Sequence, residues 1–386
     1  MLRYLTAGES HGPALTTILE GLPAGLKVSA EEINVDLKRR QGGYGRGGRM
    51  KIESDQADIL GGIRHGETLG GPVSLLIRNN DWKNWTDVMA IERPETPTER
   101  RRVTKPRPGH ADLAGGLKYN QRDLRNILER ASARETAARV AVGAIAKRLL
   151  AEFGVGVMSH VVRIGTVEAD VSGLTADDIR DRAEASPVRC ADPRAEAGMI
   201  AEIDRAKGLR DTIGGVFEVR VTHVPPGLGS HVHWDRKLDG RLAQAVMSIQ
   251  AVKGVEIGLG FGTTERLGSE VHDEIFYADG RFFRKTNRAG GIEGGMSNGE
   301  DILVRGALKP IATIMRTIWS VDIDTKEPFD SAKERSDICT VPAAGVIGEA
   351  VVAFVIADAM REKFGGDSVD EMKRNFDGYL QQVREY

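Results

Sequence analysis

Two histidines in glycine-flanked loops are the residues best suited to acid–base chemistry. His11 lies in Gly8-Glu9-Ser10-His11-Gly12, and His110 lies in Arg107-Pro108-Gly109-His110-Ala111-Asp112. Imidazole titrates near neutral pH, and glycine lets the backbone come close to a ligand. Residues 39–49, between the two loops, carry several arginines among glycines. Together these features predict acid chemistry on an anionic substrate.

The arginine- and glycine-rich stretch contains a formal GxGxxG match at residues 43–48. A dinucleotide fingerprint requires a strand before it and a helix after it. Here the pattern predicts a helix before the match, and the strand-like residues 50–53 follow it. We therefore reject the dinucleotide reading and predict a structured loop that binds phosphate and carboxylate groups.

Three further segments carry cationic groups on turns or at helix ends. Residues 130–136 include a capping-box pattern, Ser132-x-x-Glu135, which predicts a helix N-terminus that can bind an anion. Residues 287–291 and Lys309-Pro310 are glycine- or proline-bounded turns with a cation. In Arg335-Ser336-Asp337, the arginine is expected to keep Asp337 ionised as a base.

Composition indicates an ordinary globular protein. Lys plus Arg (54) nearly equals Asp plus Glu (56), and aromatic residues make up 5% of the 386, so we predict no nucleic-acid partner. Cys190 and Cys339 lack metal-site spacing, and His231 with His233 lacks a third ligand, so no metal site is expected. The longest apolar run, residues 351–357, is too short to cross a bilayer. We expect a cytoplasmic protein with no membrane association.

The elements that must position these loops are helices and strands in irregular alternation. Capping boxes predict helices from Ser29 through Arg40 and from Ser132 through Phe153, and Asp235 is expected to cap a helix that runs to about Val252. An apolar helix is predicted over residues 343–364. The predicted strands are 2–6, 15–19, 73–77, 157–164, 216–222 and 302–304. This order favours a mixed α+β layered fold over a doubly wound sheet.

No linker divides the chain, so we predict one domain over residues 1–386. Residues 61–70 and 290–299 share a glycine-rich pattern, and each precedes a predicted strand. This similarity leaves duplication of a half-domain and chance equally open.

The motifs together strongly resemble the chorismate synthase family over essentially the whole chain. They are residues 8–12, 43–47, 107–112, 130–136, 287–299 and 335–337. The resemblance implies a 1,4-anti elimination that converts 5-enolpyruvylshikimate 3-phosphate to chorismate, with reduced FMN required and no net redox change. It also implies a homotetramer of single-domain subunits, each a β-α-β sandwich with helices between mainly antiparallel sheets.

The resemblance also assigns roles to residues. His11 matches the group that protonates the departing phosphate, His110 the group that protonates reduced flavin, and Asp337 the acid that helps the flavin N5 act as a base. Arg40 and Arg46 match residues of the substrate pocket that contact NADPH in family members. Arg49 and Arg134 are expected to face the anionic groups of the substrate. The matching FMN-binding residues are Arg130, Ala131, Ser132, Gln250, Ala251, Gly294, Lys309, Pro310, Ile311, Ala312, Thr313 and Arg335.

One position departs from the family, in which hydroxyl residues often follow the Lys-Pro pair. Ala312 stands there and removes one possible hydrogen bond to FMN. No separate dinucleotide-binding domain is visible, so we expect the flavin to arrive already reduced, with NADPH at most an indirect reductant. Two alternatives from other classes stay open here: an RNA-binding protein that uses residues 39–49, and a flavin-dependent oxidoreductase with net electron transfer.

Overall fold

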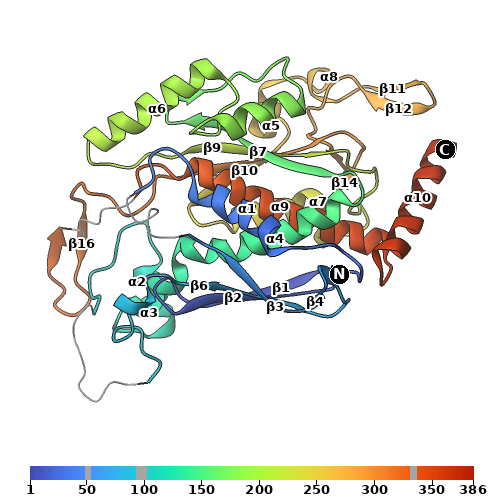
Figure 1. Cartoon of the computed structure of the whole chain (residues 1–386). Coiled ribbons are helices and arrows are strands. Elements are labelled where there is room, and N and C mark those ends of the chain that lie inside the picture. Colours follow the sequence, from blue (N-terminus) through green and yellow to red (C-terminus); the bar gives the residue numbers. More distant parts are fainter. Residues whose placement is uncertain (48–53, 93–101, 331–336) are drawn as a thin grey trace.

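Two antiparallel sheets enclose a layer of helices (Figure 1). The computed structural model describes residues 1–47, 54–92, 102–330 and 337–386. The first sheet has the strand order β1-β2-β6-β3 and the second has the order β10-β15-β9-β7-β8. The mixed α+β fold predicted from the sequence is confirmed.

The strands of the two sheets include the six strands predicted from the sequence and add three more, β3, β8 and β10. The first sheet contains β1 (Arg3–Ala7), β2 (Ala14–Glu20), β3 (Ala57–Gly61) and β6 (Val73–Arg78). The second contains β7 (Gly156–Ile164), β8 (Val167–Glu168), β9 (Gly215–Thr222), β10 (Val252–Ile257) and β15 (Ile302–Leu308). The remaining strands form antiparallel pairs outside the two large sheets. These pairs are β4 (Ile63–Arg64) with β5 (Glu67–Thr68), β11 (Ile275–Ala278) with β12 (Arg281–Arg284), β13 (Ile292–Glu293) with β14 (Met296–Ser297), and β16 (Trp319–Val321) with β17 (Pro328–Asp330).

The helices fall into an inner group and an outer group. Those between the sheets are α1 (Ala30–Gln41), α4 (Thr136–Ala151), α7 (Leu238–Met247) and α9 (Val341–Phe364). The outer helices are α2 (Asp112–Tyr119), α3 (Arg125–Ala131), α5 (Ala176–Ala185), α6 (Pro193–Gly208), α8 (Gly268–Val271) and α10 (Val369–Glu385). Short 3-10 helices cover Trp82–Asn84, Ala133–Glu135, Trp234–Arg236 and Gly260–Glu265.

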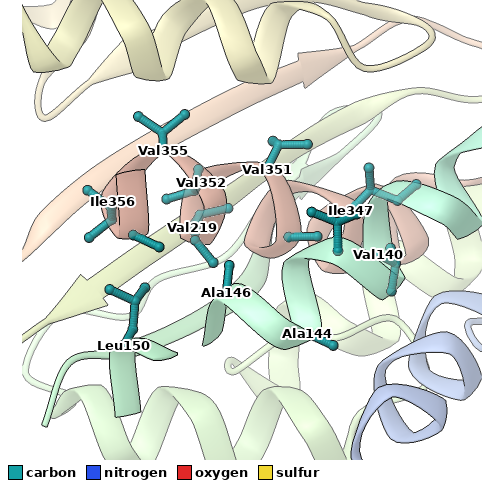
Figure 2. Close-up of a cluster of buried hydrophobic side chains, with 14 of the residues drawn as sticks. Val140, Ala144, Ala146, Leu150, Val219, Ile347, Val351, Val352, Val355 and Ile356 are labelled. Atoms are coloured by element: carbon teal, nitrogen blue, oxygen red, sulfur yellow. The ribbon is translucent and has the colours of Figure 1, made fainter. Parts of the chain in front are cut away.

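Helices α4 and α9 pack against each other to form the centre of the core (Figure 2). Val140 and Ala144 of α4 lie beside Ile347 and Val351 of α9. The two backbones come so close that any side chain at Gly143 would overlap Ala350. Small residues at the contact therefore let the helices pack at short distance, and β9 closes the cluster from one side.

Helix α9 is long and apolar enough to cross a membrane, but 89% of its most apolar stretch is buried inside the protein. A helix that is apolar on all sides and covered by protein on all sides is typical of a core. It also contains Glu349, whose carboxylate accepts hydrogen bonds from Arg39 (2.7 and 2.8 Å) and Lys147 (2.9 Å). Burial alone would raise the pKa of Glu349, but the charges of Lys147 and Arg39 lower it well below its usual range.

The two glycine-rich decapeptides form matching hairpins, β4–β5 and β13–β14. Each places a hydroxyl on the backbone of a preceding turn: Thr68 Oγ1 accepts from the N–H of Leu26 (2.9 Å), and Ser297 Oγ accepts from the N–H of Leu228 (2.8 Å). Each hairpin leads toward an interior strand of the neighbouring large sheet, β6 or β15. The similarity seen in the sequence therefore corresponds to equivalent local structure.

Two predicted helix boundaries were wrong. Asp235 lies in a 3-10 turn and does not cap α7, which begins at Leu238 and ends at Met247. Its carboxylate instead contacts His233 Nδ1 at 2.8 Å. Ser132 caps the short 3-10 helix Ala133–Glu135, so α4 begins only at Thr136, and an unpredicted helix, α3, ends just before Ser132. A local capping pattern identifies a helix start but not the kind of helix that follows.

Candidate active site

The predicted site residues gather mainly at one end of the helical layer. The last turn of α1, the first turns of α4 and α9, and helices α2 and α3 lie at this end (Figure 1). Arg40 Nε at the end of α1 donates to Thr136 Oγ1 (2.9 Å), and the N–H of Ile338 donates to the carbonyl of Gly45 (2.7 Å). Two long helices thus present their N-termini, where backbone N–H groups favour anions, to the same region.

His11 is held by a buried carboxylate and an indole. Its Nδ1 lies 2.7 Å from Glu129 Oε2, and its backbone N–H donates to the same oxygen at 2.9 Å. Arg125 Nη1 donates to the other carboxylate oxygen, Oε1, at 2.8 Å. The imidazole also stacks on Trp85 with ring centroids 3.8 Å apart. Burial by itself would raise the pKa of Glu129, but the hydrogen bonds from His11 and Arg125 lower it, so the carboxyl is ionised at neutral pH.

His110 has an equivalent set of partners within its own loop. Its Nδ1 lies 2.5 Å from Asp112 Oδ1, and Arg107 Nε donates to Asp112 Oδ2 at 2.9 Å. The side chain of Asp112 is fully buried, whereas that of His110 is 20% exposed. Burial tends to raise the pKa of Asp112, but hydrogen bonds from His110 and Arg107 outweigh it and lower the pKa far below its usual range. In the part of the chain that the structure describes, no hydrogen bond reaches Nε2 of either histidine.

A buried aspartate joins two of the predicted substrate-binding arginines. Arg40 and Arg134 are 5% and 7% exposed, and Asp55 lies between them. Arg134 Nη1 contacts both carboxylate oxygens of Asp55, one at 2.5 Å, and Arg40 Nη1 lies 3.4 Å from Oδ2. The same buried carboxylate therefore holds both guanidiniums in place.

The loop from Gly42 to Gly47 is ordered against the start of α9. Asp337 Oδ1 accepts from the N–H of Gly47 (2.6 Å), and its Oδ2 lies 3.4 Å from Arg46 Nε. On the other side of the loop, Tyr44 Oη donates to Asp204 (2.9 Å). An anchored loop of this kind fits the structured anion site that the sequence predicts better than a disordered RNA-binding segment. Arg49 and Arg335 lie outside the described residues, so their predicted roles stay predictions.

Arg130 and Ser132 connect α3 to the loop of His11. Arg130 Nη1 donates to the carbonyl of Gly8 (3.0 Å), and its Nη2 donates to Thr6 (2.7 and 2.8 Å). Ser132 Oγ donates to Ser10 Oγ at 3.2 Å. An open cavity of about 420 Å³ adjoins this point. It is lined by Tyr4, Leu5, Thr6, Arg130, Glu135, Arg139 and Gln250.

The segments later in the chain that are predicted to bind the cofactor are linked to this region by hydrogen bonds. Gln250 Nε2 donates to Glu135 Oε2 (3.3 Å), and the N–H of Lys309 donates to the carbonyl of Ala251 (3.0 Å). Lys309 Nζ in turn donates to the carbonyl of Gly109, next to His110, at 3.1 Å. The segment of residues 309–313, with Pro310, Ile311, Ala312 and Thr313, therefore begins beside the His110 loop.

Gly294 is the exception among the predicted cofactor residues that the structure describes. It lies in the turn of the β13–β14 hairpin with φ +59°. In Figure 1, β14 lies on the opposite side of the molecule from α2 and α3. A single chain therefore does not bring Gly294 together with His11 and His110. Its predicted role in FMN binding is not supported by proximity within one subunit.

Sequence reasoning missed the groups that hold the two histidines. Asp112 could have been identified as the partner of His110, because it follows the histidine by two residues in the same loop motif. Glu129, Arg125 and Trp85 had none, because Glu129 lies 118 residues from His11 in the chain. Asp55 was likewise invisible, since only the folded chain brings it to Arg40 and Arg134.

Comparison with known proteins decides the family. The family model described as chorismate synthase matches residues 2–361. The chain belongs to the chorismate synthase family. It is 60% identical over 399 residues to chorismate synthase of Geobacter metallireducens, with 100% of both chains covered, and 61% identical over 388 residues to that of Symbiobacterium thermophilum, with 99% of both covered.

A solved structure supports the same assignment. The chain matches a crystal structure of chorismate synthase with a TM-score of 0.81 and 47% sequence identity. The match covers 100% of this chain and 99% of the solved chain. The resemblance inferred from the motifs is therefore confirmed, and the chorismate synthase family provides the frame for the site described above.

Proposed function

We propose that this protein converts 5-enolpyruvylshikimate 3-phosphate to chorismate and inorganic phosphate by a 1,4-anti elimination that depends on reduced FMN. This is the lyase reaction of its family, in the shikimate pathway that leads to the aromatic amino acids. The observation that carries the proposal is the concentration of arginines and two carboxylate-bound histidines around two helix N-termini. The substrate has two carboxylates and a phosphate, which such a cationic site can bind.

The residues present fit FMN, whose phosphate needs cations and whose ring needs polar partners. Among the described residues, the Arg130 guanidinium bonds only to carbonyl and hydroxyl oxygens, and Lys309 Nζ bonds only to a carbonyl. Burial lowers the pKa of Lys309, and the nearby charge of Lys253 lowers it further. Both effects disfavour the lysine cation, so binding of an anion beside it would be favourable. Gln250 Oε1 is buried with no hydrogen-bond partner in the described part of the chain. Arg130, Ser132, Gln250 and residues 309–313 would hold the cofactor.

Proton transfer is the contribution of the protein itself. Reduced flavin, when bound, supplies electron density to the allylic system of the substrate and recovers it afterwards. His11 holds a proton at Nε2 and delivers it to the phosphate as the carbon–oxygen bond breaks. On the cofactor side of the site, His110 holds a proton and Asp337 supplies an ionised carboxylate. Arg40, Arg46, Arg49 and Arg134 bind and orient the anionic groups of the substrate.

We further propose a cytoplasmic homotetramer whose subunit is one β-α-β sandwich domain made of two related halves. The matched hairpins β4–β5 and β13–β14 support the two halves. The strand order β1-β2-β6-β3 also corresponds to β7-β9-β15-β10 when the additional edge strand β8 of the second sheet is set aside. Figure 1 is consistent with a single layered body. Sedimentation of the purified protein tests the tetramer, since a monomer or dimer at micromolar concentration would contradict it.

Product formation under anaerobic conditions tests the proposed activity. Purified protein and substrate are incubated with photoreduced FMN, with oxidised FMN, or with oxidised FMN plus NADPH, and chorismate and phosphate are quantified. We expect equimolar chorismate and phosphate with reduced FMN only, because the flavin is expected to arrive already reduced. Product with oxidised FMN plus NADPH would show that the enzyme reduces its own flavin. Absence of product in every arm would contradict the proposal.

A further inference from the structure

We propose that Glu129 is a positioning residue that fixes the imidazole of His11 so that Nε2 faces the substrate. The inference rests on the proposed function, in which His11 delivers a proton to the leaving phosphate. Glu129 itself is 2% exposed and would not touch the substrate. It would act only through the histidine that it holds.

Glu129 grips the His11 loop through its side chain and its backbone. Oε2 of Glu129 lies within hydrogen-bond distance of both the backbone N–H and Nδ1 of His11 (2.9 and 2.7 Å). Its backbone carbonyl accepts from the N–H of Ser10 at 3.0 Å. An ionised carboxylate can only accept, so the proton at this contact lies on Nδ1 of the imidazole. The second nitrogen, Nε2, is then the one available for proton transfer.

Trp85 restricts the remaining freedom of the ring. The indole stacks on the His11 imidazole at 3.8 Å and an interplanar angle of 32°. Its own Nε1 donates to Asp81 Oδ2 at 2.8 Å, which fixes the indole. Arg125 lies 5.4 Å from the Trp85 ring and also bonds to Glu129. The imidazole is thus held in its plane by the carboxylate and on one face by the indole.

The charge of Glu129 is the essential part of this arrangement. Hydrogen bonds from His11 and Arg125 overcome the effect of burial and lower the pKa of Glu129, so the carboxylate persists at neutral pH. An amide at this position has the same size but no charge. Its NH₂ group could donate to Nδ1, which favours a neutral ring whose proton on Nε2 is far less acidic than that of an imidazolium, or its oxygen could hold a rotated ring. Either change reduces the rate of proton transfer while leaving substrate binding intact.

Glu129→Gln in the full-length protein tests the inference. Because only the proton transfer is affected, we expect kcat to fall at least tenfold, with KM for the substrate and Kd for FMN changed less than threefold. Glu129→Asp, which keeps the charge, should recover part of the lost kcat. Glu152→Gln is the matched control: Glu152 is also bonded to an arginine one helical turn away, Arg148, but lies at the other end of α4.

A double-mutant cycle distinguishes positioning from a general structural role. If Glu129 acts through His11, Glu129→Gln should cause no further loss of kcat in a His11→Gln background. An equal loss in both backgrounds, or KM, FMN affinity and Tm that move together with kcat, would overturn the inference. Wild-type protein without turnover would refute the proposed function and this inference with it, whereas active wild type and equally active Glu129→Gln would refute the inference alone.

Discussion

Lys309 Nζ donates to the carbonyl oxygen of Gly109 at 3.1 Å, and this contact joins the expected FMN-binding segment to the loop that carries His110. The two segments are 200 residues apart in the chain. Gly109 has φ +77°, a conformation that favours glycine, and a side chain there would approach Lys309 Nζ. The predicted cofactor-binding segment and the His110 loop are therefore parts of one structural unit.

Replacing Lys309 should weaken cofactor binding. Lys309→Met keeps the aliphatic stem but removes the cation, so we expect the Kd for FMN to rise at least tenfold, as measured by fluorescence titration. Lys285→Met is a suitable control, because Lys285 lies over the Phe276 ring in the β11–β12 hairpin instead. Unchanged FMN affinity in Lys309→Met would remove this lysine from the cofactor site.

Loss of either site histidine should abolish most turnover without unfolding the protein. General acid catalysis by a single side chain contributes about 10²–10⁴-fold, so His11→Ala and His110→Ala should each lower kcat by that order. We expect little loss of stability, because Arg125 and Arg107 still pair with the carboxylates of Glu129 and Asp112 that the histidines contact. The exposed His231→Ala serves as the control. A kcat near that of the wild type in either variant would exclude that histidine from the mechanism.

Asp337 offers a test of charge at the start of α9. Asp337→Asn retains an oxygen that can accept from the N–H of Gly47 but removes the carboxylate beside Arg46. We expect kcat to fall about 10–100-fold with an unchanged Tm. Asp204→Asn removes the carboxylate that contacts the other side of the same loop through Tyr44, and it should leave kcat within twofold. Equal kcat values in the two variants would contradict the assignment of Asp337.

Stability should depend on pH through Glu218, a buried carboxylate of β9. Burial would raise its pKa, but the hydrogen bond and charge of His160 and the contact with Arg305 lower it to about 2. Because this value lies below that of the unfolded chain, the ionised carboxylate stabilises the fold above about pH 4.3, and that stability is lost as the pH falls toward 2.

The variant Glu218→Gln measures this contribution. We expect urea unfolding at pH 7 to show a loss of about 3 kcal/mol relative to the wild type, because the amide cannot replace the charge that Glu218 presents to Arg305 and to the buried His160 side chain. The difference should shrink between pH 4.5 and pH 3. A difference that stays constant over this range would show that the carboxylate is not ionised in the native state.

Most of the fold was accessible from the sequence, because its strong signals are local. The apolar helix over residues 343–364 became α9, with two more residues at its start, and every predicted strand is present within about two residues of its expected ends, except the one at 302–304, which extends to Leu308. The capping box at Ser29 formed as predicted. The helix expected from Asp235 begins only at Leu238, and Asp235 contacts His233 instead of capping it.

The loop residues of the candidate site could be predicted from the sequence, but the side chains that hold them could not. Glycine-flanked histidines and arginine clusters are visible along the chain, so His11, His110 and the arginine loop could be identified. Their partners Glu129 and Asp55 are created by tertiary contacts that no spacing rule encodes. The FMN role of Gly294 stays a prediction, since one chain places its hairpin far from α2 and α3.

The redox balance of the flavin over one turnover tests the central claim most directly. Anaerobic protein with stoichiometric reduced FMN is mixed with excess 5-enolpyruvylshikimate 3-phosphate, and chorismate and flavin absorbance are followed together. The proposed elimination predicts many chorismate molecules for each flavin, with the flavin still reduced at the end. One flavin oxidised for each product formed would show net electron transfer and would contradict the account in favour of an oxidoreductase.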